Sequence, residues 1–180
     1  ILFAFILVST LIVIIITILY LLNNTQQERL QDLQYIYNNS EKITMNYSKI
    51  KDILNNLNSD NTEQIDYIIN DQLYESIDNK IVQNFFLNGD SEKKKYIKDK
   101  NDCDNFSYIL YGNLLKWQNI LENIHPFSFG IVYLKYISEN ISHTMNIFIN
   151  KNSEIYCIES QTNIISLCNN INKIYYRIII

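Results

Sequence analysis

The sequence predicts an α+β fold carried behind a membrane-spanning helix. Residues 1–22 carry no charge, the chain up to Pro126 repeats its apolar residues mostly at helical spacing, and strand-like runs with short connections follow Pro126. Helices followed by closely linked strands are typical of α+β domains, and short connections favour antiparallel neighbours. We therefore divide the chain into a transmembrane signal anchor at 1–22, a helical stalk at 23–57 and an α+β domain at 58–180.

The uncharged segment 1–22 is long enough to cross a bilayer. As a helix it would span roughly 33 Å, against about 30 Å for the hydrocarbon core. A secretory signal peptide normally has a shorter apolar core and a small-residue cleavage site, so we expect a single-pass membrane protein with the lipid bilayer as a partner. The flank after the helix has one cation, Arg29, against Glu28 and Asp32, which weakly favours a non-cytoplasmic domain.

The stalk at 23–57 is polar and contains neither Gly nor Pro. Over two heptads its apolar residues alternate steps of four and three: Ile43, Tyr47, Ile50, Leu54 and Leu57. This spacing is typical of a coiled-coil seam, through which the chain would self-associate. An amphipathic helix packed on the domain itself fits the same pattern, and both interpretations stay open.

Two more helices and four strands are predicted in the domain. The first helix follows a cap cluster at 59–62, runs from Ile65 to Ile81 along one apolar face and ends near a turn at 85–90. The second begins at Cys103 and ends before Pro126, because proline biases the preceding residue away from helix. The strands are expected at residues 129–137, 143–149, 155–159 and 174–180.

Charge and cysteine content exclude two classes of protein. A net charge of −4 and a pI near 5.1 argue against a nucleic-acid partner, and we interpret the run Lys93–Lys95 as a solvated face. Three cysteines do not make a disulfide scaffold. Cys157 and Cys168 are the plausible pair in an oxidising compartment, although we favour the alternative that both are small buried apolar residues.

Cys103, His143 and Glu159 are the candidate catalytic residues. Cys103 follows Asp102, a residue that can cap a helix, so the helix dipole would favour the thiolate. His143 and Glu159 lie on neighbouring predicted strands at the same end of a hairpin, where an imidazole could take the thiol proton and a carboxylate could fix the imidazole. Each residue alone has a plainer structural interpretation as a buried thiol, a packed histidine or an exposed charge.

A resemblance to a known family adds to this interpretation. Three segments carry it, each in the expected order: Asp102-Cys103-Asp104-Asn105-Phe106-Ser107, His143-Thr144-Met145-Asn146 and Glu159-Ser160-Gln161-Thr162. Together they resemble the papain-like cysteine protease domain at the C-terminus of a fungal agglutinin, and related short phage and bacterial domains. The resemblance covers roughly residues 96–168 and implies Cys103 as nucleophile, His143 as base and Glu159 as the third member.

The resemblance implies a papain-like or transglutaminase-like α+β core. The implied protein is a membrane-anchored cysteine hydrolase that cleaves amide or peptide bonds, or transfers acyl groups, through a Cys103 thioester, with a protein or peptide as substrate. Asp104, Gln161 and Asn146 are secondary candidates for shaping the site. The alternative function is a non-catalytic, membrane-anchored interaction protein with a degenerate enzyme fold.

No cofactor is expected from the residues themselves. The cysteines and histidines lack the close pairs that metal sites use, such as CxxC or HxxxH, so we predict no metal ligands. Calcium enters by the resemblance only, without identifiable ligands. Asn105 stands where the family has a second acid, and no lectin module is visible in this chain.

Overall fold

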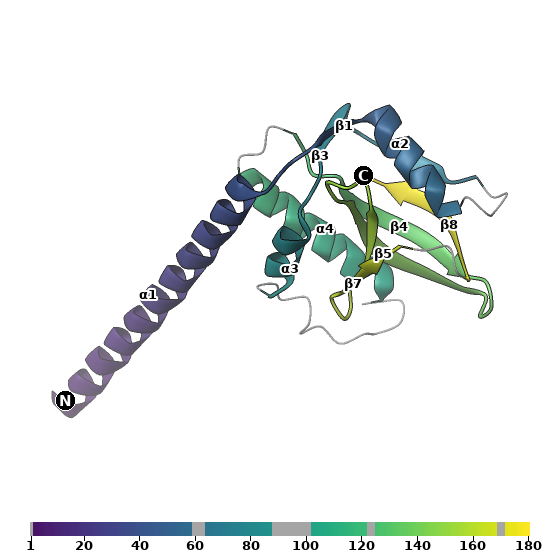
Figure 1. The fold of residues 1–180 in the computed structure, drawn as a ribbon. Coiled ribbons are helices and arrows are strands. Elements are labelled where there is room, and N and C mark those ends of the chain that lie inside the picture. Colours follow the sequence, from purple (N-terminus) through teal and green to yellow (C-terminus); the bar gives the residue numbers. More distant parts are fainter. Residues whose placement is uncertain (1, 59–63, 88–101, 122–124, 169–171) are drawn as a thin grey trace. The chain divides into compact units, whose positions relative to one another are not determined.

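The computed structural model describes residues 2–58, 64–87, 102–121, 125–168 and 172–180 (Figure 1). The chain forms two compact units, residues 1–39 and residues 40–180. The predicted cap cluster at 59–62, the Asn88-Gly89 part of the predicted turn and the lysine run at 93–95 lie outside the described residues. Residues 40–57, predicted as part of a stalk, belong to the second unit.

The first unit is a single helix, α1 (Leu2–Asn39). The helix continues through the boundary predicted at residue 22, and its large apolar side chains from Leu11 to Leu22 are 47–63% exposed. Among the described residues it is the one helix long and apolar enough to cross a membrane. The apolar side chains from Leu11 to Leu22 have no protein cover, which is the arrangement that a lipid environment would stabilise.

The predicted coiled-coil seam at 43–57 is buried inside the domain. Residues Thr44–Asn46 form strand β1, and α2 (Tyr47–Asn55) follows, with the Asn46 side chain accepting a hydrogen bond from the Lys49 amide at its start. A short 3₁₀ turn, η1 (Asn56–Asn58), ends this segment. The apolar side of the segment packs into the main core through Ile50, Ile53, Leu54 and Leu57. The packed amphipathic helix is therefore the correct alternative here, and the seam is not free for self-association.

The helix predicted from Ile65 to Ile81 is wrong. That stretch forms two short strands, β2 (Asp66–Ile68) and β3 (Leu73–Glu75), and a helix begins only at α3 (Asn79–Leu87). Strand β3 pairs with β1 in a two-stranded antiparallel sheet, and β2 joins the main sheet alongside β8. Isoleucine at helical spacing is also a good strand former, so pairing partners from distant parts of the chain decided the structure.

The main sheet has six strands in the order β2-β8-β4-β5-β6-β7. The strands after Pro126 are β4 (Phe129–Tyr136), β5 (Ile141–Ile149), β6 (Ile155–Glu159), β7 (Ile164–Leu167) and β8 (Lys173–Ile179). Four of them lie close to the predicted positions, and β7 is the one that the sequence pattern missed. Consecutive neighbours from β4 to β7 are antiparallel, whereas β2 runs parallel to β8.

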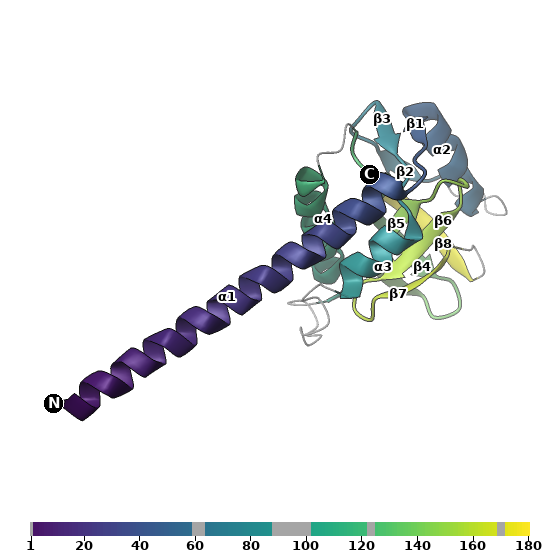
Figure 2. The same cartoon turned by 60° about the vertical axis from the view of Figure 1, so that its left-hand side comes forward.

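Helices cover both faces of this sheet (Figures 1 and 2). On one face α2 packs against alternate residues of β4 and β5, among them Val132, Leu134 and Met145. On the other face lies α4 (Cys103–Ile120), which contacts β4 and β5 and buries Phe106, Leu110 and Leu114. The helix predicted to begin at Cys103 is thus present, and it is the element that positions the candidate site.

Two predictions about the domain need correction here. The sheet is mixed, because β2, which precedes the helices α3 and α4, pairs in parallel with the last strand. The domain is therefore not a set of helices followed by an antiparallel sheet. Cys157 and Cys168 form a disulfide between β6 and the end of β7, so the favoured interpretation of two inert buried thiols is also wrong.

Candidate functional site

The start of α4 places Cys103 beside the central strands. Asp102 is the N-cap residue, with its backbone N–H 3.5 Å from Asn105 Oδ1, and its carbonyl accepts the first helical hydrogen bond from Phe106 N–H at 3.1 Å. One turn later, the Ser107 hydroxyl connects the helix to the sheet. Ser107 Oγ donates to the carbonyl of Cys103 and lies 3.3 Å from the carbonyl oxygen of Thr144 on β5. Cys103 is half-buried and is the one free cysteine, since the other two are paired.

His143 and Glu159 meet because β5 and β6 pair in the register Asn146↔Ile158. This register brings the two residues onto the same face, near the same end of the hairpin, as the sequence predicts. His143 Nε2 lies 2.6 Å from Glu159 Oε2, and the two side chains are 17% and 24% exposed. The ring of Tyr136 packs beside His143 at 5.9 Å between centroids.

Cys103 interacts with this pair through a hydrogen bond and a charge interaction with His143. A hydrogen bond with His143 lowers the pKa of the Cys103 thiol from its ordinary value, and burial opposes that shift. Burial by itself lowers the pKa of His143, but its hydrogen bonds with Cys103 and Glu159 outweigh burial and raise it to about 9. The structure therefore brings Cys103, His143 and Glu159 together, and a thiolate beside an imidazolium is nucleophilic. The catalytic roles given to these three residues stay a prediction.

The secondary candidates have structural partners. The Asp104 carboxylate accepts the Asn105 backbone N–H at 2.9 Å, and a hydrogen bond with Asp102 raises the pKa of Asp104. The Gln161 backbone N–H lies 3.4 Å from Glu159 Oε1, in the turn that follows β6. These contacts place Asp104 and Gln161 at the edge of the cluster, next to its members.

Asn146 lies beneath the cluster and is completely buried. Its Nδ2 donates to the carbonyls of Ser107 and Gly130, each at 3.1 Å, and its Oδ1 accepts from Ser160 Oγ at 2.6 Å. Ser160 Oγ also lies 3.2 Å from Ser107 Oγ. This buried network ties α4, β4 and the end of β6 together, so Asn146 supports the elements that carry Cys103 and Glu159.

In the described residues, the four side-chain types His, Cys, Asp and Glu, which commonly bind metals, form no cluster that could hold an ion. A cluster here means three or more such side chains placed together. Calcium also binds backbone carbonyl and amide oxygens, so its presence stays an expectation from the family resemblance.

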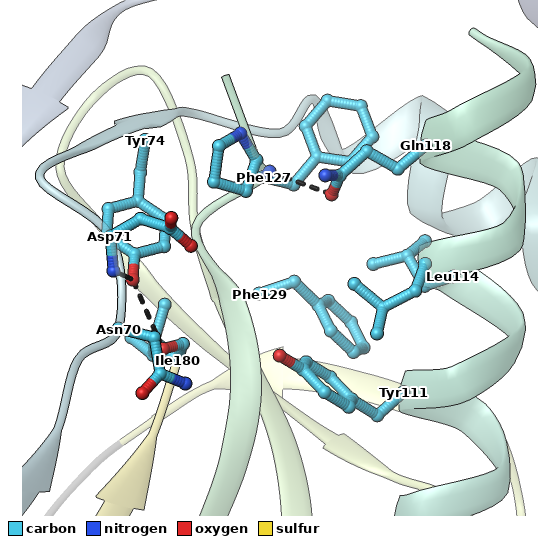
Figure 3. Close-up of a pocket in the computed structure, with 11 residues that line it drawn as sticks. Asn70, Asp71, Tyr74, Tyr111, Leu114, Gln118, Phe127, Phe129 and Ile180 are labelled. Atoms are coloured by element: carbon cyan, nitrogen blue, oxygen red, sulfur yellow. Dashed lines mark hydrogen bonds between the residues drawn. The ribbon is translucent and has the colours of Figure 1, made fainter. Parts of the chain in front are cut away.

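A cavity of about 160 Å³ lies further along α4 and was not foreseen from the sequence (Figure 3). It is lined by the segment before β3, by the C-terminal half of α4, by the start of β4 and by Ile180. Tyr111, Leu114 and Gln118 line it at spacings of three and four, which is one face of a helix. This spacing could have indicated a cavity-lining face of the helix. It was missed because Leu114 also belongs to the apolar stripe that the helix buries.

Comparisons with known proteins match this fold to agglutinins. The agglutinin C-terminal family model matches residues 74–165. A solved structure titled "PSL1a-E64 complex" is 18% identical with a TM-score of 0.65, and the match covers 76% of this chain and 51% of that chain. A crystal structure of Polyporus squamosus lectin, bound to the human-type influenza-binding epitope Neu5Aca2-6Galb1-4GlcNAc, is 17% identical with a TM-score of 0.64.

The lectin match covers 76% of this chain and 49% of the lectin chain, so this chain spans about half the length of each of these structures. No curated protein matches the sequence. At these identities the two structures establish the fold.

The comparisons correct the predicted fold class and function. The resemblance to the agglutinin C-terminal type is confirmed, but its papain-like protease part is not supported. The papain-like or transglutaminase-like core is wrong, because the structural neighbours are lectin chains with a sheet-rich fold. The prediction of a cysteine hydrolase or acyltransferase with a peptide substrate is wrong for the same reason, since an agglutinin family and lectin neighbours do not indicate an enzyme of that class.

The family itself is established by the extent of the match. Residues 74–165 are more than half of the 180-residue chain, and they include Cys103, His143 and Glu159. They also contain α4 and the central strands that hold these residues. The chain therefore belongs to the agglutinin C-terminal family.

Proposed function

We propose that this protein is a non-catalytic, membrane-anchored interaction protein whose domain, residues 40–180, binds carbohydrate. The observation that carries the proposal is the fold shared, over 76% of the chain, with a lectin solved on a glycan epitope. Membership of an agglutinin family supports the same class of ligand. The chain spans about half of that lectin, and the proposal assigns the glycan site to residues 40–180 of this chain.

The helix α1 supports membrane anchoring. Residues 1–22 have no charge, and the apolar side chains from Leu11 to Leu22 have no protein cover. The protein should stay in the membrane pellet after alkaline carbonate extraction, and deletion of 1–22 should release the domain into the soluble fraction. Membrane retention of the deleted protein would contradict the assignment.

The disulfide supports a non-cytoplasmic domain, where glycans are displayed. Disulfides form and persist in oxidising compartments, and Cys157 and Cys168 are bonded. Cys103 is the one free thiol and therefore reports which side the domain faces. A membrane-impermeant maleimide should label Cys103 on intact cells, while labelling that requires permeabilisation would place the domain on the cytoplasmic side.

Glycan binding is tested on the full chain in lipid nanodiscs, which avoids detergents with sugar head groups. The chain should bind a subset of an immobilised glycan array, and the corresponding free sugar should compete. Cys103→Ala should bind the same glycans with the same affinity, because the proposal assigns no reaction to the thiol. Absence of competable binding to any glycan, or its loss in Cys103→Ala, would contradict the proposal.

A further inference from the structure

Five Asn-x-Ser/Thr sequons occur in the sequence, and the structure separates them by their local backbone. Such a sequon is the acceptor motif for N-linked glycans, which are bulky and need a position on the surface. In a chain this rich in Asn, several sequons are expected by chance, so the motif alone selects none of them. The five asparagines all lie in the described residues: Asn23, Asn38, Asn46, Asn105 and Asn140.

Four of the five sequons are wholly or mostly helical. Asn23 and Asn38 lie in α1, and Asn23 directly follows the uncharged segment 1–22. Asn46 is the N-cap residue of α2, where its Oδ1 accepts the Lys49 backbone N–H at 2.9 Å. Residues two apart on a helix do not face each other, so the asparagine amide and the hydroxyl two residues later point in different directions. An enzyme site that reads both groups together is poorly served by these sequons.

The Asn105 sequon is withdrawn into the core. Asn105 lies in the first turn of α4, and its third residue, Ser107, is completely buried. Ser107 Oγ donates to the Cys103 carbonyl at 2.9 Å and lies 3.2 Å from Ser160 Oγ. The hydroxyl of this sequon is therefore engaged inside the domain.

Asn140 lies at the tip of a hairpin. Strands β4 and β5 pair as far as Tyr136↔Ile141, and residues 137–140 connect them. The backbone of Asn140 has a φ of 57°, in the left-handed region that Asn adopts more readily than most residues. All three residues of the sequon are exposed, with Ile141 at 54%. A glycan attached to Asn140 can therefore extend into solvent.

The contacts that hold this turn lie on its other side. The Ile137 backbone N–H donates to the Asn172 carbonyl at 3.0 Å, and the Ser138 backbone N–H donates to Asn172 Oδ1 at 2.8 Å. Both bonds use the start of the turn, whereas the sequon begins at its last residue. A glycan on Asn140 therefore leaves them intact, and the modification is compatible with the folded domain.

We propose that Asn140 is an N-glycosylation site of this protein. The inference rests on the proposed non-cytoplasmic placement of the domain, because sequons are glycosylated in chains that enter the secretory route. The disulfide supports the same placement. In the reaction, Asn140 Nδ2 forms a bond to the anomeric carbon of a sugar carried on a lipid-linked diphosphate. The bond from that carbon to the diphosphate oxygen breaks, the diphosphate leaves with the electron pair, and the amide loses one proton.

The test expresses the full chain in eukaryotic host cells that glycosylate asparagine, and treats the membrane fraction with peptide-N-glycosidase. The parent should migrate faster on a denaturing gel after treatment. Release of the glycan converts the asparagine to aspartate, so mass spectrometry should find Asp at position 140. Asn140→Gln should abolish the mobility shift, whereas the matched controls Asn46→Gln and Asn105→Gln should keep it.

Two variants of Ser142 give a second readout that leaves Asn140 in place. Ser142→Ala removes the hydroxyl of the sequon and should abolish the shift. Ser142→Thr restores a hydroxyl and should keep the shift. This pair separates loss of the acceptor motif from a folding defect caused by changing the turn residue.

The outcomes distinguish the site from the placement. If the impermeant maleimide labels Cys103 on intact cells but the parent carries no glycan, the site is wrong and the placement stands. A shift of unchanged size in Asn140→Gln also overturns the site. If labelling needs permeabilisation and the parent carries no glycan, both the placement and the site fall.

Discussion

The two ends of α4 carry two different kinds of surface. At its start, Cys103 contacts His143, which in turn lies 2.6 Å from Glu159 in a half-buried, hydrogen-bonded cluster. Tyr111 follows eight residues later, roughly 12 Å along the axis, and lines an open cavity of aromatic and amide groups. The Cys103 thiol and the cavity therefore occupy separate parts of one helix. The chemistry at one end does not define the function of the whole domain.

The largest effect that separates the two ends is expected in stability. Asn146→Ala removes three hydrogen bonds of the buried network beneath the Cys103 end and leaves the carbonyls of Ser107 and Gly130 without this donor. We expect a loss of about 2–4 kcal/mol in the free energy of unfolding. Urea denaturation measures it, with Asn119→Ala on the exposed side of α4 as the control, within about 0.5 kcal/mol of the parent. A loss under about 1 kcal/mol for Asn146→Ala would show that the network is not essential.

The disulfide should be the next contribution in size. It joins residues 11 apart and holds β7 against β6, the strand that carries Glu159. Its replacement by two serines should cost about 2–3 kcal/mol, chiefly because the unfolded chain regains freedom. Unfolding curves of the oxidised parent, the reduced parent and the double serine variant test this. Identical midpoints for all three would contradict the bond's contribution and weaken the argument for an oxidising compartment.

The reactivity of Cys103 should change with pH in a way that depends on His143. The pKa of the thiol is lowered, so the thiolate persists below the ordinary thiol pKa and is lost as the pH falls through the lowered value. His143→Ala removes the main cause of the shift, so alkylation by iodoacetamide at pH 7 should slow about tenfold or more. His125→Ala is the control, since it changes the chain's other histidine. Equal alkylation rates for His143→Ala and the parent would show that His143 does not lower the pKa of the Cys103 thiol.

The smallest predicted effect lies at the cavity end. Burial and the charge of Asp71 raise the pKa of Tyr111, and Asp71→Asn removes the charge but not the burial. The pKa of Tyr111 should therefore fall but stay above that of an exposed tyrosine, because burial, the larger cause, remains. An NMR titration of ring-labelled tyrosine measures it. An unchanged Tyr111 pKa would show that the carboxylate does not face the cavity.

Part of this fold could be predicted because local pattern decided it. The helix at Cys103 has a cap residue at its start and one apolar stripe, and four strands after Pro126 alternate between short turns, so sequence and structure agree there. The stretch from Ile65 to Ile81 could not be predicted, because β2 and β3 depend on pairing with β8 and β1 from distant parts of the chain. Isoleucine spacing alone does not reveal those partners.

The candidate site divides in the same way. Cys103, His143 and Glu159 are rare residue types in a fixed order, so their proximity followed from strand register and helix start. The cavity is built from common residues on four separate segments, and Asp71 and Tyr111 meet through tertiary packing alone. The enzyme interpretation failed at a further step, because the chemistry of three residues was taken as the function of the whole domain.

The central claim, that the domain binds carbohydrate, is tested most directly by one binding isotherm. The full chain in nanodiscs is titrated with a glycan that it binds on the array, in parallel with Cys103→Ala. We predict saturable binding by the parent, and the same affinity for Cys103→Ala. Lack of saturable binding by the parent, across every glycan on the array, would contradict the claim.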